Sequence, residues 1–221
     1  MKIFSGTIAA LALAALSITA YAADGSSLKP PPGARVAIVM FEDLECPTCA
    51  TDYPLVWQTA EAHHIPVVLR DFPLGPNHPW SFDAAVYARF FDTKSEKLGN
   101  DFRAYIFRNQ PQINKTNLRQ YVDKFANDNK TPLPFVLDPD NKLRDKVIAD
   151  YDFGMKIGII HTPTIFVVGN GGPATPAVEV TDTNQLSQIV GDMLAKAPPA
   201  KAAPAKSPPA KAKKKSQANA K

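Results

Sequence analysis

The sequence predicts an α/β fold in which helices flank a central mixed sheet and a helical segment is inserted between two parts of that sheet. Two observations support this prediction. Residues 35–41 and 65–71 are apolar and rich in β-branched side chains, and a helical pattern lies between them, which is the order of a β-α-β unit. After a long helical region, the pattern returns to short apolar strands at residues 164–168 and 177–180.

The first β-α-β unit begins with a strand that we expect to be buried on both faces, because residues 36–41 are continuously apolar. In the helix that follows, residues 49–63, the apolar side chains recur at helical spacing: Tyr53, Val56, Trp57 and Ala60. Pro54 lies inside this run and should kink the helix or limit its first turns. The second strand, residues 65–71, should pair in parallel with the first, since a helix joins them.

The inserted region, about residues 77–157, is predicted to be helical. Its candidate helices are residues 80–91, 102–107, 117–126 and 140–155. Asp138 or Asp140 is available to cap the last of them.

The last part of the domain returns to the sheet. Gly169 to Gly172 form a turn after the strand at residues 164–168. A short strand follows, and Thr181 or Asp182 then caps a final helix. The apolar face of this helix consists of Leu186, Ile189, Val190 and Leu194.

Residues 1–22 have the features of a secretory signal peptide. Lys2 supplies a positive start, residues 8–20 form an alanine-rich apolar run, and Ala20-Tyr21-Ala22 fits a cleavage site of small residues. The apolar run is shorter than the ~20 residues that a membrane-spanning helix needs. We therefore expect an extracytoplasmic protein, in the periplasm after cleavage. Residues 23–34 would be a linker to one domain of residues 35–195.

Residues 196–221 form a separate tail that is rich in Lys, Ala and Pro and contains no acidic residue. Such a composition predicts disorder. The whole chain has a net charge of +4, yet residues 3–195 hold 16 basic and 21 acidic residues, so the domain itself is acidic. The tail could contact an anionic envelope polymer or lipid headgroups through its charge, or serve as a solvated spacer.

Cys46 and Cys49 are the only cysteines of the chain, and they form a C-x-x-C motif. A four-residue loop gains little from a structural crosslink, because the loop-closure entropy that a disulfide removes grows with loop length. A redox-active dithiol is therefore the preferred interpretation. Half of a metal site and an inert pair are the alternatives.

The metal alternative needs two further ligands, and His63 and His64 form the only local histidine cluster. They lie at the far end of the helix that starts near Cys49, which places them about 20 Å away at the helical rise per residue. The sequence therefore predicts no metal site and no organic cofactor.

A redox pair needs a group that stabilises the thiolate of one cysteine. Cys46 should lie between the end of a strand and the start of a helix, where unpaired N–H groups and the helix dipole favour negative charge. Pro47 suits the first helical turn. Cys46 would then be the exposed nucleophile, and Cys49, one turn further in, would be more buried. Glu45 beside Cys46 would oppose thiolate formation.

A second informative stretch is Thr162-Pro163-Thr164, directly before an apolar strand. A proline is unusual there because it cannot donate to the sheet. A cis peptide before Pro163 would let the chain turn tightly into the strand, and an ordinary trans proline is the alternative.

Together these features resemble the thioredoxin fold. They are the strand, the C-P-x-C motif, Pro54 in the helix, the parallel strand and Thr162-Pro163-Thr164 before a strand. Four further features resemble the extracytoplasmic DsbA-like branch. They are the long helical insertion, the stretch from Arg70 to Leu74, His78-Pro79, and the string containing Gly158, Thr162 to Thr164, Phe166 and Val167. The resemblance implies that Cys46 is the nucleophile and Cys49 the resolving thiol. It also implies that Thr162 and Pro163 form a cis-proline loop that pairs with substrate.

One position departs from this family pattern. DsbA-like proteins and thioredoxins often place a buried acid six residues before the first cysteine, where this chain has Met40. Glu42, Asp43 and Glu45 are the nearest acids, and we expect them to face solvent. A proton acceptor for Cys49 would then be another group or water.

The resulting functional prediction is a thiol-disulfide oxidoreductase that acts as an oxidase on substrate proteins with cysteine thiols. It would be a monomer that needs a redox partner to reset the pair. The chain has no room for a dimerisation domain before the first strand, which disfavours an isomerase. A reductase, or a non-catalytic envelope-binding protein, remains the alternative. Pro47, Thr48 and His161 are expected to tune the cysteines, His161 through a positive imidazole.

Overall fold

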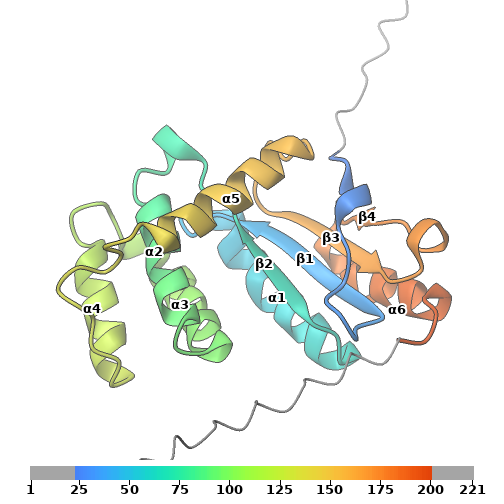
Figure 1. Cartoon of the computed structure of the whole chain (residues 1–221), viewed down its shortest axis with the longest axis horizontal. Coiled ribbons are helices and arrows are strands. Elements are labelled where there is room, and N and C mark those ends of the chain that lie inside the picture. Colours follow the sequence, from blue (N-terminus) through green and yellow to red (C-terminus); the bar gives the residue numbers. More distant parts are fainter. Residues whose placement is uncertain (1–22, 201–221) are drawn as a thin grey trace, which may run out of the picture.

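The structure is a computed structural model that describes residues 23–200 (Figure 1). The strands are β1 (Val36–Glu42), β2 (Val67–Asp71), β3 (Thr164–Gly169) and β4 (Val178–Glu179). The helices are α1 (Pro47–His63), α2 (Ser81–Asp92), α3 (Glu96–Asn109), α4 (Leu118–Asp128), α5 (Lys142–Lys156) and α6 (Leu186–Lys196). The predicted signal peptide and most of the predicted tail lie outside the described residues.

The four strands form one mixed sheet in the order β2-β1-β3-β4. β1 pairs in parallel with β2, and β3 runs antiparallel to both β1 and β4. This arrangement confirms the predicted central mixed sheet and the parallel β-α-β unit. Since β1 is flanked on both sides, all seven of its residues are buried.

Helices cover both faces of the sheet. α1 and α6 pack together on one face, beneath Val36, Ile38 and Met40. The opposite face carries Ala37, Val39 and Phe41, which pack with the end of α5 and with the N-terminal segment. Alternate residues of β1 therefore belong to two separate apolar cores, as the two-residue period of a strand requires.

Helices α2 to α5 follow β2 and lie together beside the sheet (Figure 1). Their core is aromatic: Phe91, Phe102 and Phe125 pack around one another with ring centroids 4.7–5.2 Å apart. This confirms the inserted helical region. The N-cap of its last helix is Asn141 and not Asp138 or Asp140, although the Asp138 carboxylate accepts the N–H groups of Leu143 and Arg144 in the first turn.

The end of the domain extends slightly beyond its predicted limit. α6 continues to Lys196, and the Arg35 guanidinium donates to the carbonyl oxygens of Leu194, Ala197 and Pro198. Ala197 is buried by these contacts. Within residues 23–200, no helix is both long enough and apolar enough to cross a membrane.

Candidate functional site

The two cysteines lie where β1 gives way to α1. Cys46 is the N-cap of α1 with an extended backbone, φ −80° and ψ 120°, and Pro47 is the first helical residue. From the C-cap of α3, the side-chain amide of Gln110 donates to the carbonyl oxygens of Leu44 and Cys46 at 2.9 and 3.0 Å. This contact fixes the turn that presents Cys46 in front of the helix N-terminus.

Both cysteines carry free thiols; Cys49 is the more buried, as predicted, and Cys46 is more enclosed than predicted. The exposed fraction is 5% for Cys46 and 0% for Cys49. The prediction of an exposed Cys46 is therefore wrong, although Cys46 is the more accessible of the two. The reason is a neighbouring loop: the Cys46 thiol donates to the carbonyl oxygen of Thr162 at 3.2 Å.

The two thiols differ in acidity because their surroundings differ. The pKa of Cys46 is lowered to about 5, chiefly by the Cys49 thiol, and also by the Thr162 side chain and the backbone amides of Cys49 and Thr48. Burial raises the pKa of Cys49 well above its usual value. Cys46 is therefore a thiolate at neutral pH, and Cys49 keeps its proton.

The loop that covers Cys46 has a cis peptide bond between Thr162 and Pro163. The Thr164 hydroxyl donates to the carbonyl oxygen of His161 at 2.8 Å and so braces the loop. The His161 side chain is exposed and lies 3.4 Å from the same hydroxyl through its Nδ1 atom. His161 is not among the groups that lower the pKa of Cys46, whereas the backbone of Thr48 is.

The expectation that Glu42 and Asp43 face solvent is wrong: each is only 1% exposed. β1 extends one residue further than predicted and includes Glu42. By strand alternation, Glu42 lies on the same face of the sheet as Met40. The chain thus has a buried acid two positions after the position at which the family pattern places one.

Glu42 belongs to a buried network of charges between the sheet and the helical insertion. Its Oε1 atom accepts from the Arg103 guanidinium at 2.9 Å, and Oε2 has no hydrogen-bond partner among the described residues. Arg103 also contacts Asp92 at 2.8 and 3.0 Å and Asp71 at 3.7 Å. Burial raises the pKa of Glu42 to about 8, although Arg103 opposes the shift.

Asp43 and Glu45 hold the loops around the cysteines. Asp43 accepts from the backbone of Glu45 and Leu74 at 2.7 Å each and contacts the His78 imidazole at 2.8 Å. The Glu45 carboxylate turns away to accept the Trp80 N–H at 2.8 Å, in front of α2. The expectation that Glu45 opposes the Cys46 thiolate therefore fails, because its charge is directed to the start of another helix.

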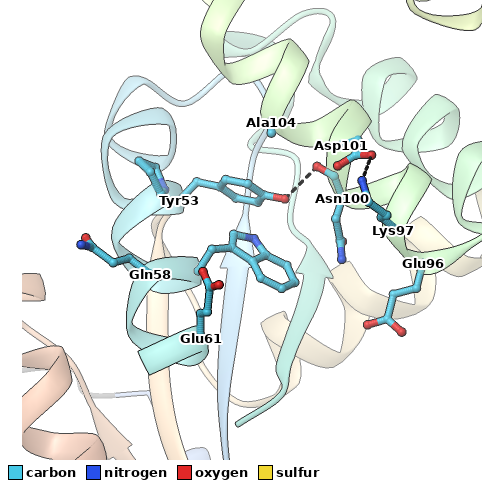
Figure 2. A pocket seen from close by; sticks show the side chains of 10 residues that line it. Tyr53, Gln58, Glu61, Glu96, Lys97, Asn100, Asp101 and Ala104 are labelled. Atoms are coloured by element: carbon cyan, nitrogen blue, oxygen red, sulfur yellow. Dashed lines mark hydrogen bonds and ion pairs between the residues drawn. The ribbon is translucent and has the colours of Figure 1, made fainter. Parts of the chain in front are cut away.

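Two hollows lie on different faces of α1. The larger, about 750 Å³, lies between α1 and α3 and is lined by Tyr53, Trp57 and Glu61 among others. Figure 2 shows the Tyr53 hydroxyl pointing to the carbonyl oxygen of Asn100, to which it donates at 3.0 Å. This hollow includes neither cysteine. The smaller, about 330 Å³, is lined by Thr48, Thr162 and Pro163 and adjoins Cys46.

Within residues 23–200, no group of three or more His, Cys, Asp or Glu side chains is placed to hold a metal ion. The His63 side chain contacts the Ser187 hydroxyl of α6 at 2.9 Å. It lies at the last turn of α1, so α1 itself separates it from Cys46.

The sequence patterns did not indicate that Glu42, Arg103 and Asp71 form a buried charge network beside the cysteines. The apolar stretch from Val36 to Phe41 predicts a strand that is buried on both faces. Such a pattern does not indicate on which face of the sheet a following acid lies. Arg103 lies 61 residues after Glu42, so no local pattern links them. A usable signal is the register of the parallel strands, which places Glu42 directly beside Asp71. Two adjacent acids at the end of a buried strand pair require a buried cation.

The thiol acidity leads to a first prediction. In the reduced protein, we expect the rate of alkylation by iodoacetamide to rise with pH around a midpoint near 5, because the pKa of Cys46 is lowered to about 5. A free cysteine titrates at about 8.5. Mass spectrometry of the native protein should find the label on Cys46 and not on Cys49. A midpoint near 8.5, or equal labelling of both, would contradict this geometry.

Comparison with known proteins identifies the family. A family model described as thioredoxin matches residues 31–177. A search of curated protein sequences found no match. Similar solved structures include alpha-DsbA1 from Wolbachia pipientis, at 18% identity over 76% of this chain and 92% of that chain, with a TM-score of 0.59. The catalytic domain of Proteus mirabilis ScsC has 19% identity over 76% and 88% of the two chains, with a TM-score of 0.59.

A third solved structure, Wolbachia pipientis alpha-DsbA2, has 18% identity over 75% of this chain and 85% of that chain, with a TM-score of 0.52. At these identities the likeness concerns the fold. It supports a sheet with a helical insertion of the DsbA type. The chain therefore belongs to the thioredoxin family and has a DsbA-like fold.

Proposed function

We propose that the protein is a thiol-disulfide oxidoreductase that donates the Cys46–Cys49 disulfide to substrate proteins. The observation that supports this most strongly is the contrast between the two thiols. Cys46, with a pKa of about 5, is a good leaving group, and Cys49 is fully buried behind it. A stable Cys46 thiolate stabilises the reduced form, which makes the disulfide easy to give away. The similar alpha-DsbA2 is itself described as a thiol-disulfide exchange protein.

The reaction runs in two exchange steps. A substrate thiolate attacks Cys46 Sγ, the Cys46–Cys49 bond breaks, and Cys49 leaves and takes up a proton. A second thiolate of the substrate then attacks the substrate sulfur of the mixed disulfide and releases Cys46 as a thiolate. The substrate dithiol is oxidised by two electrons and the cysteine pair is reduced. The carbonyl oxygen of Thr162, which lies 3.2 Å from Cys46 Sγ, is placed to accept a substrate N–H.

Glu42 is our candidate for the group that exchanges a proton with Cys49. Its charge acts on the Cys49 thiol, and one of its oxygens has no hydrogen-bond partner among the described residues. A carboxyl with a pKa of about 8 can both take up and release a proton near neutral pH. Glu42 would then fill the role that the family pattern gives to an acid at the position of Met40.

The Glu42→Gln variant tests this role. We expect Cys49 to attack a mixed disulfide roughly tenfold more slowly at pH 7, since general base catalysis by a side chain contributes about 10²–10⁴-fold and water can replace part of it. The measurement is the release of glutathione from protein glutathionylated at Cys46, followed by stopped flow from pH 5 to 9. The variant should lose the inflection near pH 8. A profile identical to that of the wild type would contradict the role.

The direction and the location of the reaction belong to the proposal as well. We propose that residues 1–22 direct export, that the mature domain acts as a monomer in the periplasm without a cofactor, and that a separate redox partner reoxidises the pair. Reduction is the second candidate direction. The low pKa of Cys46 favours oxidation over it, because the disulfide becomes more oxidising as the thiolate becomes more stable.

The direct test uses the oxidised protein, residues 23–221, and a reduced, unfolded model protein with several cysteines. We expect thiols to be lost from the model protein in step with the appearance of free Cys46 and Cys49. Thiol titration and mass spectrometry measure both. If oxidised protein leaves the model protein reduced while reduced protein cleaves its disulfides, the reductase direction is correct.

A further inference from the structure

The groove beside Cys46 is polar and acidic, which points to a class of substrate. This hollow of about 330 Å³ lies between the start of α1, the cis-proline loop and the end of β4. Its lining includes five threonines: Thr48, Thr162, Thr164, Thr181 and Thr183. Two carboxylates, Asp52 and Glu179, and the imidazole of His161 also belong to the lining, and no lysine or arginine does.

Two residues of the groove lining lie next to Cys46. Thr162, which lines the groove, has its carbonyl oxygen 3.2 Å from Cys46 Sγ, and Thr48 follows Cys46 by two residues in α1. A polypeptide whose cysteine reaches Cys46 must therefore lay a neighbouring side chain along this hollow. The volume is sufficient for one or two side chains, at the low end of ordinary binding pockets.

The carboxylates are held in place by the surrounding elements. The Asp52 Oδ1 atom accepts from the Thr183 hydroxyl at 3.2 Å, which joins α1 to the segment before α6. Glu179 belongs to β4 and pairs with Phe166 of β3. Both side chains are half-buried, and Asp52 has no ion-pair partner among the described residues, so its charge is not neutralised within the domain.

A second feature also points to a ligand. Thr162 is only 9% exposed. Its hydroxyl is buried and has no hydrogen-bond partner among the described residues. Buried polar groups are normally paired. A bound peptide that shifts this loop slightly would supply the missing partner at the point where it meets Cys46.

We propose that this groove selects substrate segments with a lysine or arginine next to the reacting cysteine. The cationic head would lie between Asp52 and Glu179, and its aliphatic stem would run along the threonine methyl groups. This proposal rests on the proposed disulfide exchange and specifies its substrate class.

The test uses three peptides with one cysteine flanked by Lys, Gln or Glu on both sides. The measured quantity is the second-order rate constant for opening of the Cys46–Cys49 disulfide by the peptide thiolate, which forms a mixed disulfide at Cys46 and frees the Cys49 thiol. It is divided by the rate constant of the same peptide with hydroxyethyl disulfide. This division removes differences in intrinsic thiol reactivity. We expect the Lys peptide to react about tenfold faster than the Glu peptide at low salt, because each half-exposed charge contributes modestly. The ratio should fall in 0.5 M salt by about half or more.

The variant D52N/E179Q should lower the ratio of Lys to Glu peptide to about two or less. The matched control is D123N/D128N, which makes the same charge change on exposed acids of α4, far from β4 (Figure 1), and should keep the wild-type ratio. The groove proposal is overturned if the ratio of the Lys-peptide to the Glu-peptide rate constant is near one in the wild type. It is also overturned if this ratio is unchanged in D52N/E179Q. If none of the peptides opens the disulfide, the proposed function itself fails.

Discussion

The variant Cys46→Ala is expected to lose all disulfide exchange, down to the rate of the uncatalysed reaction. The sulfur of Cys46 is the atom that every substrate must meet, and its thiolate is stabilised by the Cys49 thiol, the Thr162 side chain and two backbone amides. The Cys49 thiol cannot replace it, because it is fully buried and its pKa is raised. The measurement is the reaction of the reduced variant with a model protein that carries a disulfide, followed as cleavage of that disulfide or as a mixed disulfide with the variant.

Cys49→Ala is the matched variant, with the same change of side chain one turn away. It should retain the reactive Cys46 but be unable to resolve a mixed disulfide. When it is mixed with a substrate that carries a disulfide, its Cys46 thiolate should attack that disulfide, release one substrate thiol and remain as a covalent adduct, visible as a mass increase that a reductant reverses. Far-ultraviolet circular dichroism should show both variants folded. Exchange retained in Cys46→Ala, or adducts absent in Cys49→Ala, would refute the assigned roles.

The second large effect is on stability. Replacing Arg103 with Met should reduce the free energy of unfolding by about 3–5 kcal/mol, because it leaves Glu42 buried without its cation and removes one of the two arginines beside Asp71, the other being Arg89. Arg103 is 1% exposed and pairs with Glu42 at 2.9 Å and Asp92 at 2.8 Å. Urea denaturation of the reduced protein measures the change. The control is Arg119→Met, whose exposed pair with Asp123 is worth at most about 1 kcal/mol.

The cost of Arg103→Met should depend on pH. Burial already raises the pKa of Glu42 to about 8 in the folded protein, while the unfolded chain titrates near 4.5. Between these values the folded state binds more protons, so this group lowers stability as pH rises. Removal of Arg103 strengthens that effect. The loss should therefore be smaller at pH 5 than at pH 8. A loss below about 1 kcal/mol at both pH values would show that the network does not support the fold.

The strands and helices could be predicted because their patterns are local. The continuous apolar run of β1 and the apolar spacing in α1 depend on neighbouring residues only, and both elements lie within a few residues of their predicted limits. Pro54 lies within α1 without ending it. The C-x-x-C motif likewise indicated the cysteine pair, because its position between strand and helix is part of the same local pattern.

The surroundings of the cysteines were harder to predict, because distant residues determine them. The burial of Glu42 depends on Arg103 in α3, and the direction of Glu45 depends on the start of α2. The enclosure of Cys46 depends on Thr162, which lies 116 residues further along the chain. A sequence pattern gives no distance between such residues. The same is true of the acidic groove, whose two carboxylates come from α1 and β4.

The reduction potential of the Cys46–Cys49 pair tests the central claim most directly. The mature domain is equilibrated with glutathione buffers of known ratio, and the fraction of oxidised protein is read from alkylation and mass. A Cys46 pKa of about 5 and a desolvated Cys49 predict a potential clearly above the roughly −270 mV of thioredoxin. A potential at or below that of thioredoxin would contradict disulfide donation. Failure to form the disulfide at any glutathione ratio would contradict a redox function for the pair.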